Sequence, residues 1–199
     1  MTTRALRICV VGDELAAGVG DPRALGWVGR VAARTHAPAT PAFFTLAVPG
    51  EATTDLASRW ETETSSRFAP GYDNRLVIAL GRADADNTGS LARSRLNLAN
   101  ILDVAVGAGL GVFVVGPPPG PAEIAKRLAE LSAAWHEVAH RRGIAYVDCY
   151  RPLRDHEQWL SDMAAGDGVH PGQAGYGLMT WLVLHNGWHN WLGLPTDIG

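Results

Sequence analysis

The chain has very little lysine. Lys126 is the only one in 199 residues, lysine and arginine together number 17, and the formal net charge is −3 at pH 7. A Schiff-base lysine, a phosphate-binding Gly-Lys loop and a basic nucleic-acid surface all depend on residues that are scarce here. We therefore expect no nucleic-acid partner, and a small molecule as substrate or ligand.

Cysteine and long apolar runs are also scarce. Cys9 and Cys149 are the only cysteines, and they fall in two separate expected strands, which favours reduced, buried thiols. No apolar run approaches the ~18 residues of a membrane span. The first expected strand follows directly after Met-Thr-Thr-Arg-Ala, without a signal-type segment. We expect a cytoplasmic protein with no membrane partner, and one domain over residues 1–199.

Short apolar runs alternate with longer amphipathic stretches along the whole chain. Strands are expected at about Arg7–Val11, Ala42–Val48, Arg75–Leu80, Gly111–Val115 and Ile144–Cys149. Helices are expected near Leu25–His36, Thr54–Phe68, Leu91–Gly107, Ala122–Arg141 and Gly172–His185. This alternation is typical of an α/β fold in which helices cover both faces of a parallel sheet. We predict a three-layer α/β/α sandwich with a five-stranded parallel sheet, of flavodoxin-like type.

The first expected strand ends in Gly12-Asp13-Glu14-Leu15. Ligands bind in the crevice at the carboxyl ends of parallel strands, and the free backbone N–H groups at a helix start favour an anion there. We therefore expect Glu14 to be ionised and directed into the crevice. An acidic first turn that only caps a helix explains the same residues equally well.

Three further stretches lie at comparable places: Val48-Pro49-Gly50-Glu51, Leu80-Gly81-Arg82-Ala83-Asp84 and Asp167-Gly168-Val169-His170-Pro171. With the Gly-Asp-Glu-Leu stretch they resemble, in order and spacing, the SGNH or GDSL-type hydrolase superfamily. Its blocks carry a nucleophilic serine in Gly-Asp-Ser, a glycine after the second strand, an asparagine in Gly-x-Asn-Asp, and an Asp-x-x-His pair. The resemblance implies the strand order 2-1-3-4-5 and a hydrolase of small esters. Nothing in the sequence calls for an organic cofactor or a metal.

The chain departs from this pattern at two positions. Glu14 stands where the superfamily has its nucleophilic serine, and Ala83 where it has the asparagine that binds the oxyanion. Gly50 matches the glycine whose N–H donates to the oxyanion, and Asp167 and His170 match the acid–base pair. Losing one oxyanion donor typically costs ~10²–10³ in rate, whereas losing the nucleophile costs on the order of 10⁶. The usual serine mechanism through position 14 is therefore excluded.

Three interpretations of the altered site remain open. In the first, Glu14 is a carboxylate nucleophile or base, and His170, oriented by Asp167, activates water. Displacement at an sp³ carbon needs no oxyanion hole, so the replacement at position 83 would cost little. In the second, the site is inactive, Glu14 pairs with His170 and with Arg82, and the chain is a pseudo-hydrolase that binds a ligand or a partner. In the third, Glu14 is a base toward water and the chain hydrolyses small esters. The fork of Arg82 also suits an anionic group of a substrate.

A competing motif is His136-Glu137-Val138-Ala139-His140, which matches the zinc-protease pattern H-E-x-x-H. Its two histidines share a helix face, but a third ligand is not evident. Apolar residues at helical spacing in the same stretch predict an ordinary helix packed on the sheet. We therefore predict no metal site.

Other features are expected to be structural. The C-terminal segment contains Trp181, Trp188 and Trp191, which more often cap a core than close a crevice or serve a partner. Asp13 is expected to order its turn through backbone hydrogen bonds. Thr53 and Thr54 are near Gly50 in sequence, but they are weak candidates for a relocated nucleophile, because a base must lie within hydrogen-bond reach.

Overall fold

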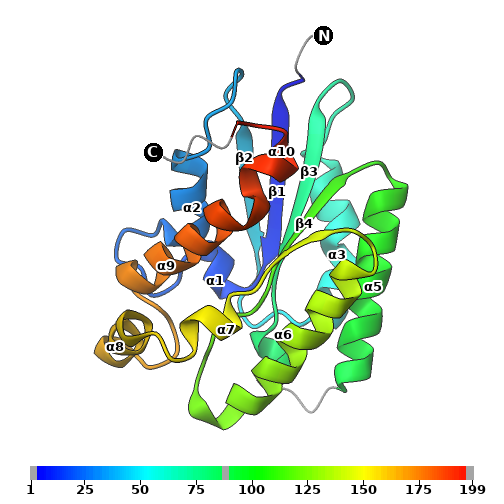
Figure 1. Cartoon of the computed structure of the whole chain (residues 1–199). Helices are drawn as coiled ribbons and strands as arrows, with labels where there is room; N and C mark the ends of the chain where they lie inside the picture. Colours follow the sequence, from blue (N-terminus) through cyan, green and yellow to red (C-terminus); the bar gives the residue numbers. More distant parts are fainter. Residues whose placement is uncertain (1–3, 87–89, 196–199) are drawn as a thin grey trace.

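A five-stranded parallel sheet forms the centre of the molecule. The structure is a computed structural model and describes residues 4–86 and 90–195. The strands are β1 (Leu6–Gly12), β2 (Ala42–Ala47), β3 (Asp73–Ala79), β4 (Gly111–Val115) and β5 (Ala145–Val147), in the order β2-β1-β3-β4-β5 (Figure 1). The expected fold class and strand order are confirmed.

β1 is the central strand and contributes to two hydrophobic cores. Val10 is in register with Thr45 of β2 and with Val77 of β3. Successive side chains of a strand point to opposite faces, so Leu6, Ile8 and Val10 enter one core while Cys9 and Val11 enter the other. Burial on both faces explains why this strand is an uninterrupted apolar run rather than an alternating one.

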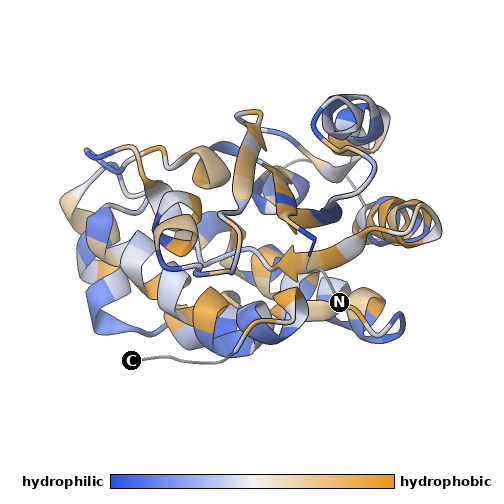
Figure 2. Cartoon of the chain, turned by 90° about the horizontal axis from the view of Figure 1, so that it is seen from above, coloured by the Kyte–Doolittle hydropathy of each residue, from blue (hydrophilic) through white to orange (hydrophobic). Residues whose placement is uncertain are grey.

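Helices cover both faces of the sheet. They are α1 (Glu14–Ala17), α2 (Gly26–Ala33), α3 (Thr53–Ser65), α4 (Arg82–Asp86), α5 (Leu91–Gly107), η1 (Ala122–Ile124), α6 (Ala125–His140), α7 (Tyr150–Leu153), α8 (Glu157–Ala165), α9 (Gln173–Val183), η2 (Leu184–Trp188) and α10 (His189–Leu192). α2 and α9 pack on one face, and α3, α5 and α6 on the other (Figure 1). Figure 2 shows the largely hydrophobic strands enclosed between these layers. Across residues 4–86 and 90–195, no helix has the length and apolarity to cross a membrane.

The last strand and the segment after it differ from the expectation. β5 ends at Val147, because Asp148 Oδ1 accepts the N–H groups of Tyr150 and Arg151 and thereby starts α7. Cys149 was expected in the strand; it lies in helical backbone at the start of α7, yet it is free and fully buried. The helix α8 was not expected at all, because only two of its nine residues are buried and the apolar stripe is short.

The C-terminal tryptophans do not share one environment. Trp188 is fully buried and contacts Phe113, as does Trp191. Arg75, near the start of β3, donates to the Trp191 carbonyl at 2.6 Å, so these two rings cap the core at the end of the sheet where the strands begin. For Trp181 the expectation is wrong, because 56% of this residue is exposed on α9.

Candidate active site

The turn after β1 fixes the position of Glu14. Asp13 has extended backbone, and its Oδ1 accepts the N–H of Leu15 at 3.0 Å, which makes it the N-cap of α1. Gly12 permits the close approach of β3, since a Cβ there would lie 2.3 Å from the Ala79 carbonyl oxygen. The expected role of Asp13 in ordering the turn is confirmed, and Glu14 becomes the first residue of α1.

The two carboxylate oxygens of Glu14 have different surroundings. Oε2 accepts the N–H of Gly50 at 2.7 Å. Oε1 lies 3.5 Å from Nη2 of Arg82 and 3.9 Å from Nε2 of His170. Only 11% of the Glu14 side chain is exposed. The N–H that the resemblance assigns to an oxyanion is therefore occupied by the protein's own carboxylate, while the second oxygen faces the imidazole.

Asp167 orients His170. Its Oδ2 lies 2.6 Å from the imidazole Nδ1, and its Oδ1 accepts the backbone N–H groups of Val169 and His170 at 2.8 and 2.7 Å. These hydrogen bonds hold the pKa of the Asp167 carboxyl well below its ordinary value, and the bond from the His170 imidazole has the largest effect. An ionised carboxylate at Nδ1 favours the proton on that nitrogen and leaves Nε2, which faces Glu14, as the basic one.

Arg82 joins two loops across the site. Its Nη1 donates to the Val169 carbonyl at 2.9 Å, and its Nη2 is the group near Glu14. Only 15% of the Arg82 side chain is exposed. Ala83, which is 8% exposed, places a methyl group where the resemblance predicts an amide donor. The guanidinium of Arg82 thus supplies the positive charge next to Glu14, and Ala83 supplies no hydrogen bond.

A polar network that the sequence analysis missed holds the loop around Gly50. Thr53 donates to Asp84 through its backbone N–H at 2.9 Å and through its hydroxyl at 2.6 Å. Asn97 donates to the hydroxyls of Thr53 and Thr54 at 3.3 and 2.9 Å. A carboxylate therefore does lie within hydrogen-bond reach of the Thr53 hydroxyl, but Thr53 is only 1% exposed, and this burial argues against its use as a relocated nucleophile. The network ties the start of α3 to α4 and α5.

Asp13 and Glu14 are adjacent carboxylates in different settings. Asp13 is 2% exposed. Burial, together with the negative charge of Glu14, raises the pKa of the Asp13 carboxyl to about 7. Arg82 acts in the opposite direction. Asp13 is therefore close to half-protonated at neutral pH, a property that the Gly-Asp-Glu stretch alone did not reveal.

The H-E-x-x-H stretch lies on α6, away from this arrangement. The rings of His136 and His140 are 6.0 Å apart. Glu137 forms ion pairs with Arg95 and Arg141 instead of facing a shared ligand. In the part of the chain that the structure describes, no three histidine, cysteine or acidic side chains are grouped to hold a metal ion.

Comparison with known proteins decides the family. The model of the GDSL-like lipase/acylhydrolase family matches residues 10–178, which contain all the blocks described above. The chain belongs to this family. The comparison with curated proteins gives no match.

Solved structures agree with this GDSL-like fold. A lipase/acylhydrolase from Enterococcus faecalis superposes with a TM-score of 0.76 at 24% identity, over 93% of this chain and 96% of that one. The esterase EstA from a Pseudoalteromonas species gives 0.74 at 15% identity, over 94% and 98%. The acetylxylan esterase Axe2 from Geobacillus stearothermophilus gives 0.73 at 16%, over 98% and 97%. At these identities the likeness establishes the fold.

Proposed function

We propose that this GDSL-like protein is a hydrolase that attacks an electrophilic sp³ carbon and forms a covalent ester on Glu14. The observation that carries the proposal is the orientation of the Glu14 carboxylate. One oxygen is held by the Gly50 N–H, and the other is turned toward His170. A nucleophilic carboxylate needs this division, with one oxygen free to attack and one fixed by a donor.

The first step is displacement at carbon. Oε1 of Glu14 donates an electron pair to the substrate carbon, and the bond from that carbon to its leaving group breaks, so that the leaving group departs as an anion. The 3.5 Å distance to Arg82 is longer than a hydrogen bond, which leaves Oε1 able to approach carbon. The guanidinium of Arg82 stabilises the negative charge that develops.

The second step hydrolyses the Glu14 ester. His170 takes a proton from water through Nε2, the water oxygen attacks the ester carbonyl carbon, and the negative charge falls on Oε2. The Gly50 N–H already contacts this oxygen at 2.7 Å, so it stabilises the oxyanion without rearrangement. The bond from the carbonyl carbon to Oε1 then breaks, and the alcohol leaves with Oε1 and with the proton from His170. The water oxygen takes the place of Oε1 in the Glu14 carboxyl group, and its remaining proton is released to solvent, which restores the carboxylate.

Direct hydrolysis of a carboxylic ester fits the geometry less well. A substrate carbonyl oxygen would need the Gly50 N–H, which Glu14 occupies, and the amide donor at position 83 is replaced by Ala83. Displacement at an sp³ carbon builds no oxyanion on the substrate, so neither departure is costly.

The experiment follows the fate of the covalent ester. Wild-type protein is incubated with butyl bromide and butylene oxide, and alcohol or diol formation is measured. We expect turnover that falls by about 10⁴-fold or more in Glu14→Gln. His170→Gln removes the base of the second step, so it should accumulate the alkyl ester on Glu14, detected by mass spectrometry of the peptide.

The controls separate the remaining mechanisms. If turnover persists in Glu14→Gln, Glu14 is not the nucleophile. Loss of turnover in Glu14→Gln, with no ester in His170→Gln, makes Glu14 a base toward water, and para-nitrophenyl acetate then becomes the test substrate. The double variant Glu14→Ser with Ala83→Asn restores the serine and the amide donor. Esterase activity in it would show that Asp167 and His170 are correctly placed.

The second candidate function is a binding module without turnover. The observation that favours it is that the Glu14 carboxylate accepts the Gly50 N–H and lies beside the Arg82 guanidinium. The polar groups of the site are therefore paired with one another without a substrate. This candidate would be supported if the wild-type protein turned over none of the three substrates while the double variant showed esterase activity. That result would also rule out the covalent mechanism for the substrates tested.

A further inference from the structure

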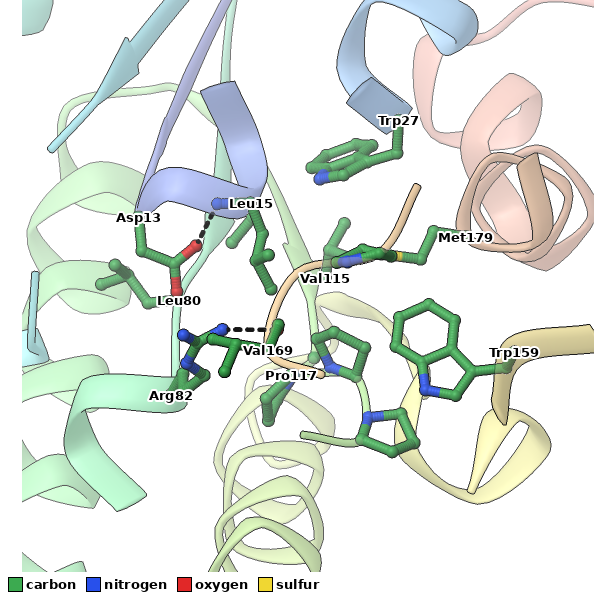
Figure 3. Close-up of a pocket in the computed structure, with 15 residues that line it drawn as sticks. Asp13, Leu15, Trp27, Leu80, Arg82, Val115, Pro117, Trp159, Val169 and Met179 are labelled. Atoms are coloured by element: carbon green, nitrogen blue, oxygen red, sulfur yellow. Dashed lines mark hydrogen bonds between the residues drawn. The ribbon is translucent and has the colours of Figure 1, made fainter. Parts of the chain in front are cut away.

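Two hollows beside α9 differ greatly in size. The cavity next to Arg82, with Trp27 and Trp159 on its opposite side (Figure 3), has a volume of about 20 Å³, which is room for a single water molecule. A second hollow of about 380 Å³ lies on the outer surface between α2 and α9. Of these two, the outer one, which we call the α2–α9 hollow, has room for an organic ligand.

The α2–α9 hollow is lined by Arg30 and Arg34 at the end of α2 and, from α9 and the turn that follows it, by Gly177, Trp181 and His185. None of its lining residues belongs to the Glu14 site. A ligand here would therefore occupy a second site.

Trp181 is an exposed aromatic ring that is held in one position. One face of its indole is stacked on the His185 imidazole, with ring centroids 4.3 Å apart and an interplanar angle of 21°. His185 Nδ1 lies 2.7 Å from the Trp181 carbonyl oxygen. Because a carbonyl oxygen only accepts, Nδ1 carries the proton, and this bond fixes the imidazole against the indole. Trp181 is nevertheless 56% exposed, so its other face is open to a ligand.

Gly177, one helical turn before Trp181, leaves part of the hollow empty. A Cβ at this position would meet no atom within 4 Å, and Gly177 has ordinary helical backbone. Neither packing nor backbone conformation requires a glycine here, although glycine is unfavourable inside a helix. The space that it leaves beside Trp181 is what this residue contributes.

The hollow carries one uncompensated positive charge. Arg30 forms an ion pair with Asp21, whose side chain is fully buried. Arg34 is exposed, and its Nη1 donates to the Arg30 carbonyl at 3.2 Å. Among the described residues, no acidic side chain lines the hollow and no carboxylate pairs with the Arg34 guanidinium. The remaining N–H groups of Arg34 can therefore bind an anion.

We propose that the α2–α9 hollow binds an aromatic carboxylate, with the ring of the ligand on the open face of Trp181 and its carboxylate on the Arg34 guanidinium. A planar ring stacks on an indole, and a guanidinium matches a carboxylate with two parallel hydrogen bonds. The single free guanidinium matches one negative charge, whereas a phosphate dianion would call for a second unpaired cation. This site goes beyond the proposed function and does not depend on it.

The test uses three probes of similar size. Benzoate has the ring and the charge, benzamide has the ring without the charge, and cyclohexanecarboxylate has the charge without a planar ring. Binding is followed on the Trp181 indole N–H signal in NMR spectra, which is assigned by its loss in Trp181→Leu. We expect benzoate to bind in the millimolar range, about tenfold more tightly than benzamide and about fivefold more tightly than cyclohexanecarboxylate.

A pair of arginine variants tests the carboxylate contact. Arg34→Gln should lower the affinity for benzoate to that for benzamide. Arg93→Gln removes the same charge from an exposed position on α5, across the sheet, and should keep the tenfold preference. If both variants keep the preference, or both lose it, Arg34 does not bind the carboxylate and the proposal fails.

Two variants test the position of the ring. In Trp181→Leu, followed on the Gly177 backbone N–H signal, benzoate should lose its advantage over cyclohexanecarboxylate. Gly177→Leu fills the space beside Trp181 and should abolish the benzoate-induced shift of the Trp181 signal. The proposal is overturned if wild-type protein binds benzoate no more tightly than the other two probes, or if benzoate leaves the Trp181 signal unmoved.

Discussion

At the scale of single residues, two neighbouring carboxylates have acquired different properties from the same turn. Asp13 is buried and caps α1, and its burial raises the pKa of its carboxyl to about 7. Glu14 meets a backbone N–H and a guanidinium instead. Neighbouring carboxyl groups with divergent environments can take different roles. Glu14 is accordingly the candidate nucleophile, and Asp13 is the residue that caps α1.

The raised pKa of Asp13 predicts how stability depends on pH. The folded-state pKa of about 7 lies above the ordinary 3.8, so between these values the folded protein binds more protons than the unfolded chain. Stability attributable to this group is therefore greatest below about pH 4 and is lost as pH rises through 7. Asp13→Asn retains a cap for α1 and removes this loss. We expect it to be more stable than wild type at about pH 8, by up to a few kcal/mol.

Urea unfolding of both proteins from about pH 4 to 8 measures the difference. Asp21→Asn is the matched control with the opposite sign. Burial raises the pKa of Asp21, but hydrogen bonds from Arg30, Arg23 and Gly26 lower it to about 2, so this carboxylate stabilises the fold above about pH 4 and Asp21→Asn should be less stable than wild type there. If Asp13→Asn shows the same pH profile as wild type, Asp13 is not titrating in this range.

At the scale of elements, the loop between α1 and α2 positions His170. A Cβ on Gly20 would lie 2.8 Å from the His170 Cβ and 2.7 Å from the Pro171 carbonyl oxygen, and Gly20 has a φ of +92°. Tyr176 of α9 donates to the neighbouring Val19 carbonyl at 2.6 Å. The loop is therefore held between the α9 region and the histidine, and its glycine permits the close approach.

Gly20→Ala should displace the His170 loop. Contact distances below 3 Å to backbone and Cβ atoms cannot be relieved by a rotamer change, and a misplacement of about 1 Å typically costs about 10²-fold in rate. We expect changed His170 ring signals in NMR spectra and slower hydrolysis of the Glu14 ester. Gly177→Ala, in α9 with open space around the added methyl, should leave the ring signals unchanged and stabilise the helix by about 0.5–1 kcal/mol. Unchanged His170 signals in Gly20→Ala would contradict this role of the loop.

The elements that the sequence predicted correctly are those with strong periodicity or complete burial. β1 was expected at Arg7–Val11 and spans Leu6–Gly12, and the helix expected at Leu91–Gly107 has those bounds. The short helix α4 and the helix α8 were missed, because a single turn or a two-residue apolar stripe gives no periodic signal.

The residues brought together at the strand ends could be anticipated for the same reason that the sheet could. Parallel strands end at one edge, so Glu14, Gly50 and Arg82 follow three neighbouring strands. The division of the Glu14 oxygens and the bond from Arg82 to the Val169 carbonyl depend on side-chain rotamers and loop packing. Local sequence does not determine these, so they became apparent only in the structure.

At the scale of the whole molecule, the sheet couples two cores. Alternate side chains of β1, β3 and β4 enter the core under α2 and α9 and the core under α3, α5 and α6. Neither core can open without exposing the other face of the same strands. We therefore expect cooperative unfolding in a single transition.

The two cysteines report on this coupling, since Cys9 lies in the core under α3, α5 and α6 and Cys149 in the core under α2 and α9. Both are fully buried; burial raises the pKa of the Cys9 thiol to about 12 and also raises that of Cys149. Neither thiol should react with a disulfide reagent in the native protein, because the thiolate is the reactive form. Cys9→Ala and Cys149→Ala each leave one thiol as the reporter of its core. In increasing urea, both thiols should become reactive at the same midpoint urea concentration, once the destabilisation caused by each substitution is subtracted. Separate midpoints would mean that one core opens while the sheet still holds the other.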